Sequence, residues 1–564
     1  MKFCPETPNL RISRAKLLVR ISLCLIFALQ IYPVILFSQQ PTQEWVARFP
    51  GPSNDIVGPY FQVDGSGNSY ITGTHQIGDS VYLLCVKYDN SGVQQWEKLY
   101  IYPGEAYIRP KGLALDSSGN VFVIAVQGPA YFLPTHGLIM KFSSINGNIE
   151  WVRRYFGEYD WADFNDIKLD KYNNIYVAGW TDTSHLLIRY NTEGDSVWVR
   201  KYHPIAPSPY KISEVATACT IDDSLNVIFT GKRRFSNPPF GSVDSVLTAK
   251  YSSSGELRWE STYLYSITAN IGEHITSDQN GNIYVGGATA NSGDGAYLTL
   301  KYDRNGIRQW VKIYDAPGNG DNTLTGIAID RINNSLYVTG GAVTNGIQMA
   351  TTIKYNSLTG DSTWVRKDTG TYSRANSSSI KIDSLGNIYT TGGTYNLGLS
   401  PFDIITRKFS DQSNPLWSIT YNGPFNGIDY GVALDFDNFR NVYVLATSES
   451  GAGIRDYVVI KYTQLTGIQT TGSEISSRFI LNQNYPNPFN PSTRIKFTIP
   501  KGSFVQVQIY DILGRIKELL VQEFMNPAEY ELTIDGSQYS SGVYFYQLVA
   551  DGKIMDTKKF MIIK

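Results

Sequence analysis

Short runs of alternating apolar and polar residues fill most of the chain, and each run ends at a turn rich in Asp, Asn and Gly. Typical runs extend over Gly112 to Asp116, Asn282 to Gly286 and Tyr297 to Tyr302. A period of two residues is the pattern of half-buried β-strands. After the N-terminal leader, no long stretch carries the period of an amphipathic helix. The pattern therefore predicts an all-β protein.

These runs belong to an internal repeat with three anchors that recur in step. The first anchor is a Trp with gaps of 47 to 61 residues, found at Trp45, Trp96, Trp151, Trp198, Trp259, Trp310, Trp364 and Trp417. The second is a cation followed by an aromatic residue, found eight times from Lys87-Tyr88 to Lys461-Tyr462. The third is an Asp-x-x-Gly/Asn-Asn turn, clearest at Asp64, Asp116, Asp170, Asp278 and Asp383 and looser near Asp222, Asp330 and Asp437. The three anchors agree on eight copies.

Each copy of about 53 residues divides into four short strands, here called a to d. Strand a ends at the Asp, strand c at the cation-aromatic pair, and strand d carries the Trp. Four-stranded units with no helices between them predict the blades of a β-propeller. The first strand, at Trp45, is of type d, and the last, at Lys461-Tyr462, is of type c. We therefore expect the N-terminal strand to complete the eighth blade and close the ring, which removes free strand edges.

The candidate binding residues lie on one face of this ring. The a–b and c–d turns are short and uniform, whereas the b–c and d–a connections vary in length and emerge together on what we call the variable face. Trp161 and Trp180 break the repeat and fall on this face in blade three, and the long b–c connection of blade four carries Arg233 and Arg234. Aromatic and Arg side chains are favoured binding anchors. The alternative is that both Trp side chains pack the loops.

The first 38 residues are expected to be a secretory signal peptide. A basic stretch ends at Arg20, and an uncharged apolar run follows from Ile21 to Phe37, which is short for a membrane span. An uncleaved anchor is the alternative.

Cys4 and Cys24 fall in this leader, so the mature chain keeps only Cys85 and Cys219, in different blades. Two such cysteines exclude a disulfide-rich scaffold. The net charge of −1 gives no electrostatic footprint for nucleic acid.

A second β-rich unit follows the repeat. The Thr/Ser/Gly-rich residues 464–478 are expected to be a linker, and residues 479–564 a small Ig-like β-sandwich. The segment Asn484 to Pro491 contains too much Pro for a central strand, so it predicts an ordered turn. The predicted fold is therefore an eight-bladed β-propeller over residues 41–463, followed by this sandwich.

The C-terminal unit resembles the type A sorting domain of the type IX secretion system. The resemblance rests on Tyr485, Pro486, Asn487, Pro488 and Phe489, on Gly514, on Gly542 and Tyr544, and on the basic ending with Lys558 and Lys559. It implies a partner, the type IX secretion machinery, and export across the outer membrane of a Gram-negative bacterium. In that family the domain is commonly removed, which leaves the cargo released or attached to the surface.

The repeats resemble the SBBP-type β-propeller repeats of exported bacterial proteins, through Gly-Asn-Ile-Tyr-Val-x-Gly and Lys-Tyr-Asp motifs. That family implies no activity for this chain. We therefore expect a monomeric binding or adhesion protein, with a glycan, polymer or protein as its ligand. No catalytic, cofactor-binding or metal-binding motif stands out in the sequence. The alternative is a propeller enzyme, either a quinoprotein-like dehydrogenase, which Asn356 to Trp364 resembles, or a glycan hydrolase.

Overall fold

The computed structural model of the chain describes residues 40–564 apart from short gaps. The predicted signal peptide, residues 1–38, lies outside the described residues. The gaps are 50, 52–58, 106, 130–134, 159–160, 183, 203–210, 238–240, 266–268, 292–293, 319, 370–373, 384–385, 397–399, 439, 452–453, 465–467, 473–477, 491, 526 and 537–538.

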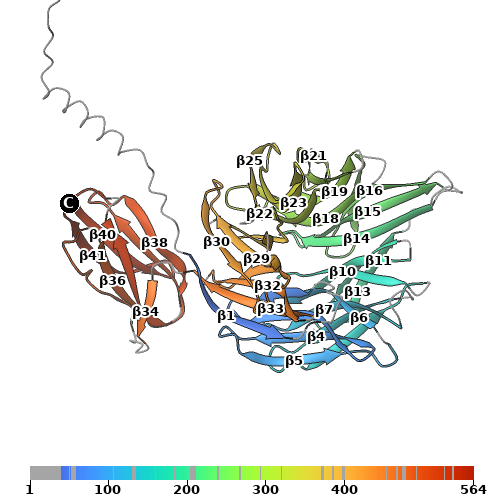
Figure 1. Ribbon diagram of the computed structural model, residues 1–564, viewed down its shortest axis with the longest axis horizontal. Helices are drawn as coiled ribbons and strands as arrows, with labels where there is room; N and C mark the ends of the chain where they lie inside the picture. The colour runs from blue at the N-terminus through green and yellow to red at the C-terminus, as the bar shows by residue number, and fades with distance from the viewer. Residues whose placement is uncertain are drawn as a thin grey trace, which may run out of the picture. The chain divides into compact units, whose positions relative to one another are not determined.

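The described residues up to Thr463 form eight antiparallel blades, as the repeat predicts (Figure 1). Blades 1 to 4 contain β2 (Tyr60–Val63), β3 (Ser69–Ile77), β4 (Ser80–Tyr88) and β5 (Gln94–Tyr100); β6 (Tyr107–Leu115), β7 (Val121–Gly128), β8 (His136–Phe142) and β9 (Ile149–Tyr155); β10 (Ala162–Leu169), β11 (Ile175–Thr181), β12 (Ser184–Tyr190) and β13 (Ser196–Tyr202); and β14 (Lys211–Ile221), β15 (Val227–Asn237), β16 (Gly241–Tyr251) and β17 (Leu257–Tyr263). Blades 1 and 2 also share a single parallel bridge between β4 and β6.

Blades 5 to 8 continue the same order, and their buried apolar residues pack against those of neighbouring blades. They contain β18 (Asn270–Ser277), β19 (Ile283–Asn291), β20 (Asp294–Tyr302) and β21 (Arg308–Tyr314); β22 (Thr323–Asp330), β23 (Ser335–Thr344), β24 (Ile347–Asn356) and β25 (Ser362–Asp368); β26 (Arg374–Ala375), β27 (Ser379–Ile382), β28 (Ile388–Asn396), β29 (Ser400–Phe409) and β30 (Pro415–Tyr421); and β31 (Asp429–Phe436), β32 (Val442–Gly451), β33 (Ile454–Thr463) and β1 (Thr42–Phe49).

The N-terminal strand closes the ring. Strand β1 pairs antiparallel with β33, from Thr42 opposite Thr463 to Phe49 opposite Tyr457, and so supplies the outer strand of blade 8. Phe49 and Tyr457 then enter one buried cluster with Ile71 of blade 1. The closure expected from the phase of the repeat is confirmed.

The repeated Trp and cation join each blade to the next. In blade 5, Trp310 Nε1 and Lys301 Nζ both donate to the main-chain oxygen of Ser357, which lies in the c–d turn of blade 6, at 3.2 and 2.8 Å. The same indole bond to the next blade is found for Trp45, Trp96, Trp151, Trp198, Trp259, Trp310 and Trp364. The Trp anchor recurs because these seven blade interfaces, within the part of the chain that the structure describes, use the same bond.

The repeated Asp is likewise used within its own blade. The buried Asp278 carboxylate accepts main-chain N–H bonds from Asn280 and Asn282 at 2.9 Å, and it also accepts the Tyr284 hydroxyl at 3.0 Å. A carboxylate with this many donors satisfies the polar groups of a tight turn. Its role is structural.

The C-terminal unit is a sandwich of two four-stranded sheets, in the orders β34-β39-β36-β35 and β38-β37-β40-β41. Its strands are β34 (Ile468–Gly472), β35 (Ile480–Leu481), β36 (Ser492–Ile499), β37 (Ser503–Tyr510), β38 (Ile516–Met525), β39 (Ala528–Asp535), β40 (Gly542–Ala550) and β41 (Lys553–Ile562). One buried cluster, which includes Phe497, Val507 and Phe560, unites both sheets. An immunoglobulin type for this sandwich stays a prediction.

One stretch within the expected linker is a strand. Residues 468–472 pair as β34 with β39, so Ile468 lies opposite Leu532. The Thr/Ser/Gly composition of residues 464–478 favours flexible chain. The unpaired edge of β39 offers main-chain partners that composition cannot reveal.

Candidate functional site

The strands of type a line the centre of the propeller, and they share one irregularity. Consecutive a strands contact one another around the ring. In six a strands the pairing with strand b shifts by one residue and leaves a β-bulge, at Lys111 of β6, Asn165 of β10, Thr217 of β14, Glu273 of β18, Thr325 of β22 and Val432 of β31. A bulge redirects side chains and occurs often beside functional sites. The bulge residues therefore mark a common level of the channel.

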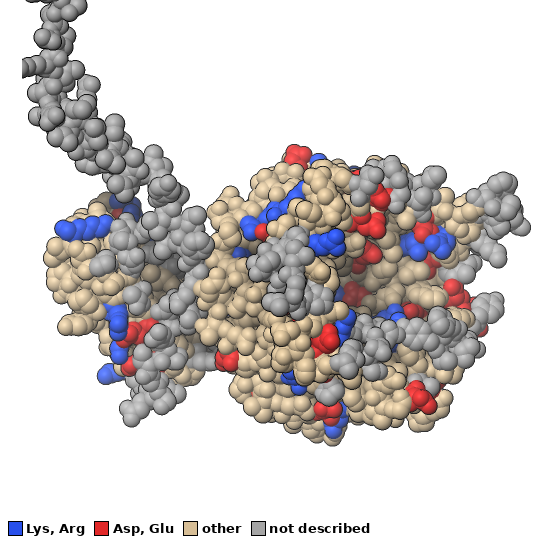
Figure 2. Space-filling model, in the orientation of Figure 1, with Lys and Arg blue, Asp and Glu red and all other residues tan. Residues whose placement is uncertain are grey.

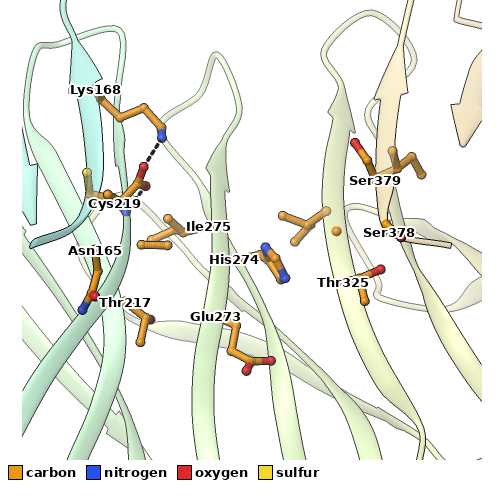
Figure 3. Close-up of a pocket in the computed structure, with 15 residues that line it drawn as sticks. Asn165, Lys168, Thr217, Cys219, Glu273, His274, Ile275, Thr325, Ser378 and Ser379 are labelled. Atoms are coloured by element: carbon orange, nitrogen blue, oxygen red, sulfur yellow. Dashed lines mark hydrogen bonds and ion pairs between the residues drawn. The ribbon is translucent and has the colours of Figure 1, made fainter. Parts of the chain in front are cut away.

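A cavity of about 380 Å³ opens at this level. It is lined from blades 3 to 7, and Figure 3 shows the lining side chains on neighbouring strands around a shared space. The polar and charged lining residues are Asn165, Asp166, Lys168, Thr217, Cys219, Glu273, His274, Thr325, Ser378 and Ser379. Cavities of this size with several convergent polar groups are typical of small-molecule sites.

On one side of the cavity, the Asp166 carboxylate is fully engaged. It accepts from Lys168 Nζ at 2.6 Å (Figure 3), and its second oxygen accepts the main-chain N–H of Cys219 at 2.8 Å. Burial raises the pKa of the Cys219 thiol well above its usual value, and the Asp166 charge adds to this shift. A thiol with a raised pKa is a poor nucleophile near neutral pH.

On the other side, Glu273 and His274 are adjacent on β18. Burial raises the pKa of the Glu273 carboxyl, and no opposite charge or hydrogen bond counteracts this shift. Burial lowers the pKa of His274 to about 4, despite the Asp166 charge and a hydrogen bond to the main chain of Leu324. The imidazole is therefore neutral near pH 7.

The variable face carries the two Trp residues selected from the sequence. The side chain of Trp161 is 37% exposed and that of Trp180 is half-buried. The main-chain oxygen of Trp161 accepts the Thr181 hydroxyl at 2.8 Å, so both Trp residues lie at the same end of blade 3. Their part in binding stays a prediction.

The two selected Arg residues differ from each other. Arg234 forms a bidentate ion pair across the hairpin with Asp244, at 2.7 and 2.9 Å, and its side chain is 46% exposed. Arg233 binds Glu214 at 2.5 Å and Glu260 at 2.6 Å. Glu214 is buried and also binds His185 of blade 3 at 2.6 Å. Arg233 therefore has a structural role within blade 4, where it supports the carboxylate that contacts blade 3, and its role in ligand binding stays a prediction.

The charge pattern in Figure 2, the metal-ligating side chains and the helix content of the described residues mark no further site. On the face in Figure 2, Lys and Arg side chains are interspersed with Asp and Glu side chains, without a large patch of one sign. Within the described ranges, no group of three or more His, Cys, Asp or Glu side chains is placed to hold a metal ion. The same part of the chain has no helix with the length and apolar character needed to cross a membrane.

The C-terminal unit matches a known family over residues 483–564, described as the secretion system C-terminal sorting domain. This unit is a sorting domain. In it, Tyr485 is 82% exposed and Lys559 is exposed, whereas Phe489 and Tyr544 belong to the core. The sorting domain implies interaction with the type IX secretion machinery. The protein is therefore exported from a Gram-negative bacterium and is either secreted or held at the cell surface.

A search of curated proteins found no significant match. Solved structures with similar folds include a fungal alcohol oxidase of the AA5 family in complex with copper, at 12% identity and a TM-score of 0.39, covering 82% of this chain and 99% of the other. Sqt1 from Chaetomium thermophilum matches at 9% identity with a TM-score of 0.46, and the match covers 75% of this chain and 99% of Sqt1. Kuenenia stuttgartiensis hydrazine synthase matches at 12% identity with a TM-score of 0.40, and the match covers 68% of this chain and 100% of the other. These likenesses carry no functional argument, and the SBBP resemblance stays a prediction.

The channel residues do not stand out in the sequence. Asn165, Thr217, Glu273 and Thr325 follow one another at about one blade length, but no motif marks a bulge in advance. Comparison of the residue types at one repeat position would have been the available signal, because Glu273 is acidic where Asn165 and Thr325 are neutral.

Proposed function

We propose that the propeller is an exported binding protein that holds a glycan, polymer or protein ligand on its variable face. Support comes from large apolar side chains that remain exposed there in consecutive blades. Phe156 is 49% exposed, Trp161 37%, Phe235 39% and Tyr265 46%. These residues lie at strand ends and connections from the end of blade 2 to the start of blade 5. Exposed aromatic groups supported by a rigid scaffold are favoured in binding surfaces.

A binding role is favoured over a catalytic one by the chemistry of the cavity. The Asp166 carboxylate is fully hydrogen-bonded, the Cys219 thiol has a raised pKa, and His274 lies next to a carboxyl group that it does not bind. A nucleophile with an adjacent base is therefore lacking among these residues.

The experiment compares the parent chain with a Trp161→Ala/Trp180→Ala variant on a glycan and cell-surface array. We expect the double variant to lose at least about tenfold in affinity for the ligand that the parent binds. Ile332→Ala is the matched control, because Ile332 is 73% exposed but lies in an a–b turn on the opposite face. Unchanged affinity of the double variant, or turnover of the ligand by the parent, would contradict the proposal.

A further inference from the structure

The bulge residues of the a strands connect neighbouring blades. Asn165 Nδ2 donates to the main-chain oxygen of Ala216 at 2.8 Å, and Thr325 Oγ1 donates to that of Ser377 at 2.7 Å. Thr217 Oγ1 donates in the same way to Gly272. In each case the acceptor is the residue just before the bulge of the next blade. Blades 3, 4 and 6 therefore follow one rule: the bulge residue supplies a hydrogen-bond donor to the following blade.

Two bulge residues depart from this rule: Val432 in blade 8, whose side chain has no polar group, and Glu273 in blade 5, the only acidic one among the described bulges. For Glu273 the equivalent acceptor is Leu324 of blade 6, and a carboxylate has no proton to donate to it. The neighbouring His274 forms a hydrogen bond with the main chain of Leu324 instead. Glu273 is thereby left with no hydrogen-bond or ion-pair partner among the described residues. A repeat position whose residue departs from the local rule without a compensating contact is a candidate functional position.

The charges around the cavity leave Glu273 uncompensated. Asp166 and Lys168 neutralise each other at 2.6 Å, and His274 is neutral. Glu273 is then the one lining carboxylate, among the described residues, that lacks a cation. An unpaired carboxylate in a partly buried site favours a positively charged partner, because charge-assisted hydrogen bonds are the stronger kind.

The remaining lining groups mainly offer acceptors. The protons of Thr217 and Thr325 are already donated to main-chain oxygens, so their hydroxyl lone pairs remain available. The Asn165 amide nitrogen is used in the same way, which leaves its oxygen. The hydroxyl of Ser378 is buried and has no partner. Such a lining suits a ligand rich in O–H and N–H donors.

We propose that the channel cavity binds a small polyhydroxylated amine, with its ammonium group on Glu273 and its hydroxyl groups on the bulge residues of the neighbouring blades. A cavity of about 380 Å³ lies at the small end of the size range of ligand pockets, which suits a ligand of the size of one sugar ring. This site is separate from the variable face, where Trp161 lies.

The test is calorimetric titration of the purified full chain with glucosamine, glucose and N-acetylglucosamine at equal ionic strength near neutral pH. These probes share a ring, but the first alone carries an ammonium group. We expect glucosamine to bind at least about tenfold more tightly than either neutral sugar. In Glu273→Gln, which keeps size and polarity, we expect this preference to fall below about twofold.

Two variants separate binding from folding. Glu273→Thr introduces the residue type of blades 4 and 6, and we expect it to lose the glucosamine preference while its melting temperature stays at or above that of the parent. Trp161→Ala/Trp180→Ala should keep glucosamine binding, so failure of the variable-face proposal is distinguishable from failure of this one. Equal affinity for glucosamine and glucose, no binding of glucosamine, or an unchanged preference in Glu273→Gln would each overturn the inference.

Discussion

The indole Nε1 of Trp45 donates to the main-chain oxygen of Asn90 at 2.9 Å, and this bond joins the last blade to the first. Lys461, opposite Trp45 on β33, donates to the same oxygen at 3.0 Å. The ring is thus sealed by the contact that joins its other blades, although here the Trp comes from the N-terminal strand. The indole also packs over Gly92, in the same turn as Asn90.

This packing predicts a difference between two glycines with positive φ. At Gly92 (φ +80°) an added Cβ would lie 2.6 Å from the Trp45 ring, whereas at Gly78 (φ +60°) it would meet nothing within 4 Å. We expect Gly78→Ala to cost about 1 kcal/mol from backbone strain alone, and Gly92→Ala about 2–3 kcal/mol because the indole must also move. Chemical denaturation measures both losses. Equal losses would show that the Trp45 contact contributes nothing at this turn.

Arg233 and Arg234 are expected to behave differently although they are neighbours. Arg233→Ala removes a partner from the buried carboxylate of Glu214, so we expect a loss of about 3–5 kcal/mol in the free energy of unfolding. Arg234→Ala breaks a pair whose arginine is largely exposed, so we expect a loss below about 1 kcal/mol. Glu214→Gln combined with Arg233→Ala should recover part of the larger loss. A double variant as unstable as the sum of the single variants would argue against a direct interaction.

His274 predicts a pH dependence of stability on the acid side. The pKa of His274 is about 4 in the folded chain and 6.5 in the unfolded chain. Between these pH values the unfolded chain therefore binds more protons than the folded chain. Stability therefore rises with pH through this window and is lost as the pH falls through it, by up to about 3 kcal/mol. His274→Gln keeps an N–H donor but does not titrate. Urea denaturation at about pH 4.5 and about pH 7.5 should give a smaller difference for the variant than for the parent.

Removal of residues 465–564 separates folding from export. All pairs of propeller strands lie between Thr42 and Thr463, so we expect the shortened chain to keep the melting temperature of the propeller. Without the sorting domain it should remain inside the outer membrane, as cell fractionation would show. A chain that ends at residue 482 is the control. It also lacks most of the sorting domain, but it retains β34 without its partner β39. Surface delivery of the shortened chain would refute the role of the domain.

The sequence predicts the ring because its anchors are local and repeated. The Asp278 turn and the contact of Trp310 with Ser357 each need only residue types at a fixed spacing, and that spacing is visible in one chain. The repeat begins with a d strand at Trp45 and ends with a c strand at Lys461. This order even predicts which two strands pair to close the ring.

The channel site could not be predicted in the same way. One extra residue at each bulge breaks the period of two, so alternation does not show that Glu273 lies beside the cavity. The structural role of Arg233 also depends on Glu214, which belongs to another strand of blade 4, and on the contact that Glu214 makes with His185 of blade 3. Distances across a blade interface depend on strand register that an isolated motif does not contain.

The pairing of β1 with β33 also sets the order in which the protein can be completed. Strand β1 is synthesised first, yet its partner is the last strand of the propeller. Until that partner emerges, the edges of both terminal blades stay open, and such edges invite pairing with other chains. A chain that stops within its first seven blades therefore cannot close the ring. Ring closure thus requires the whole propeller to be synthesised, but it does not require a complete sorting domain.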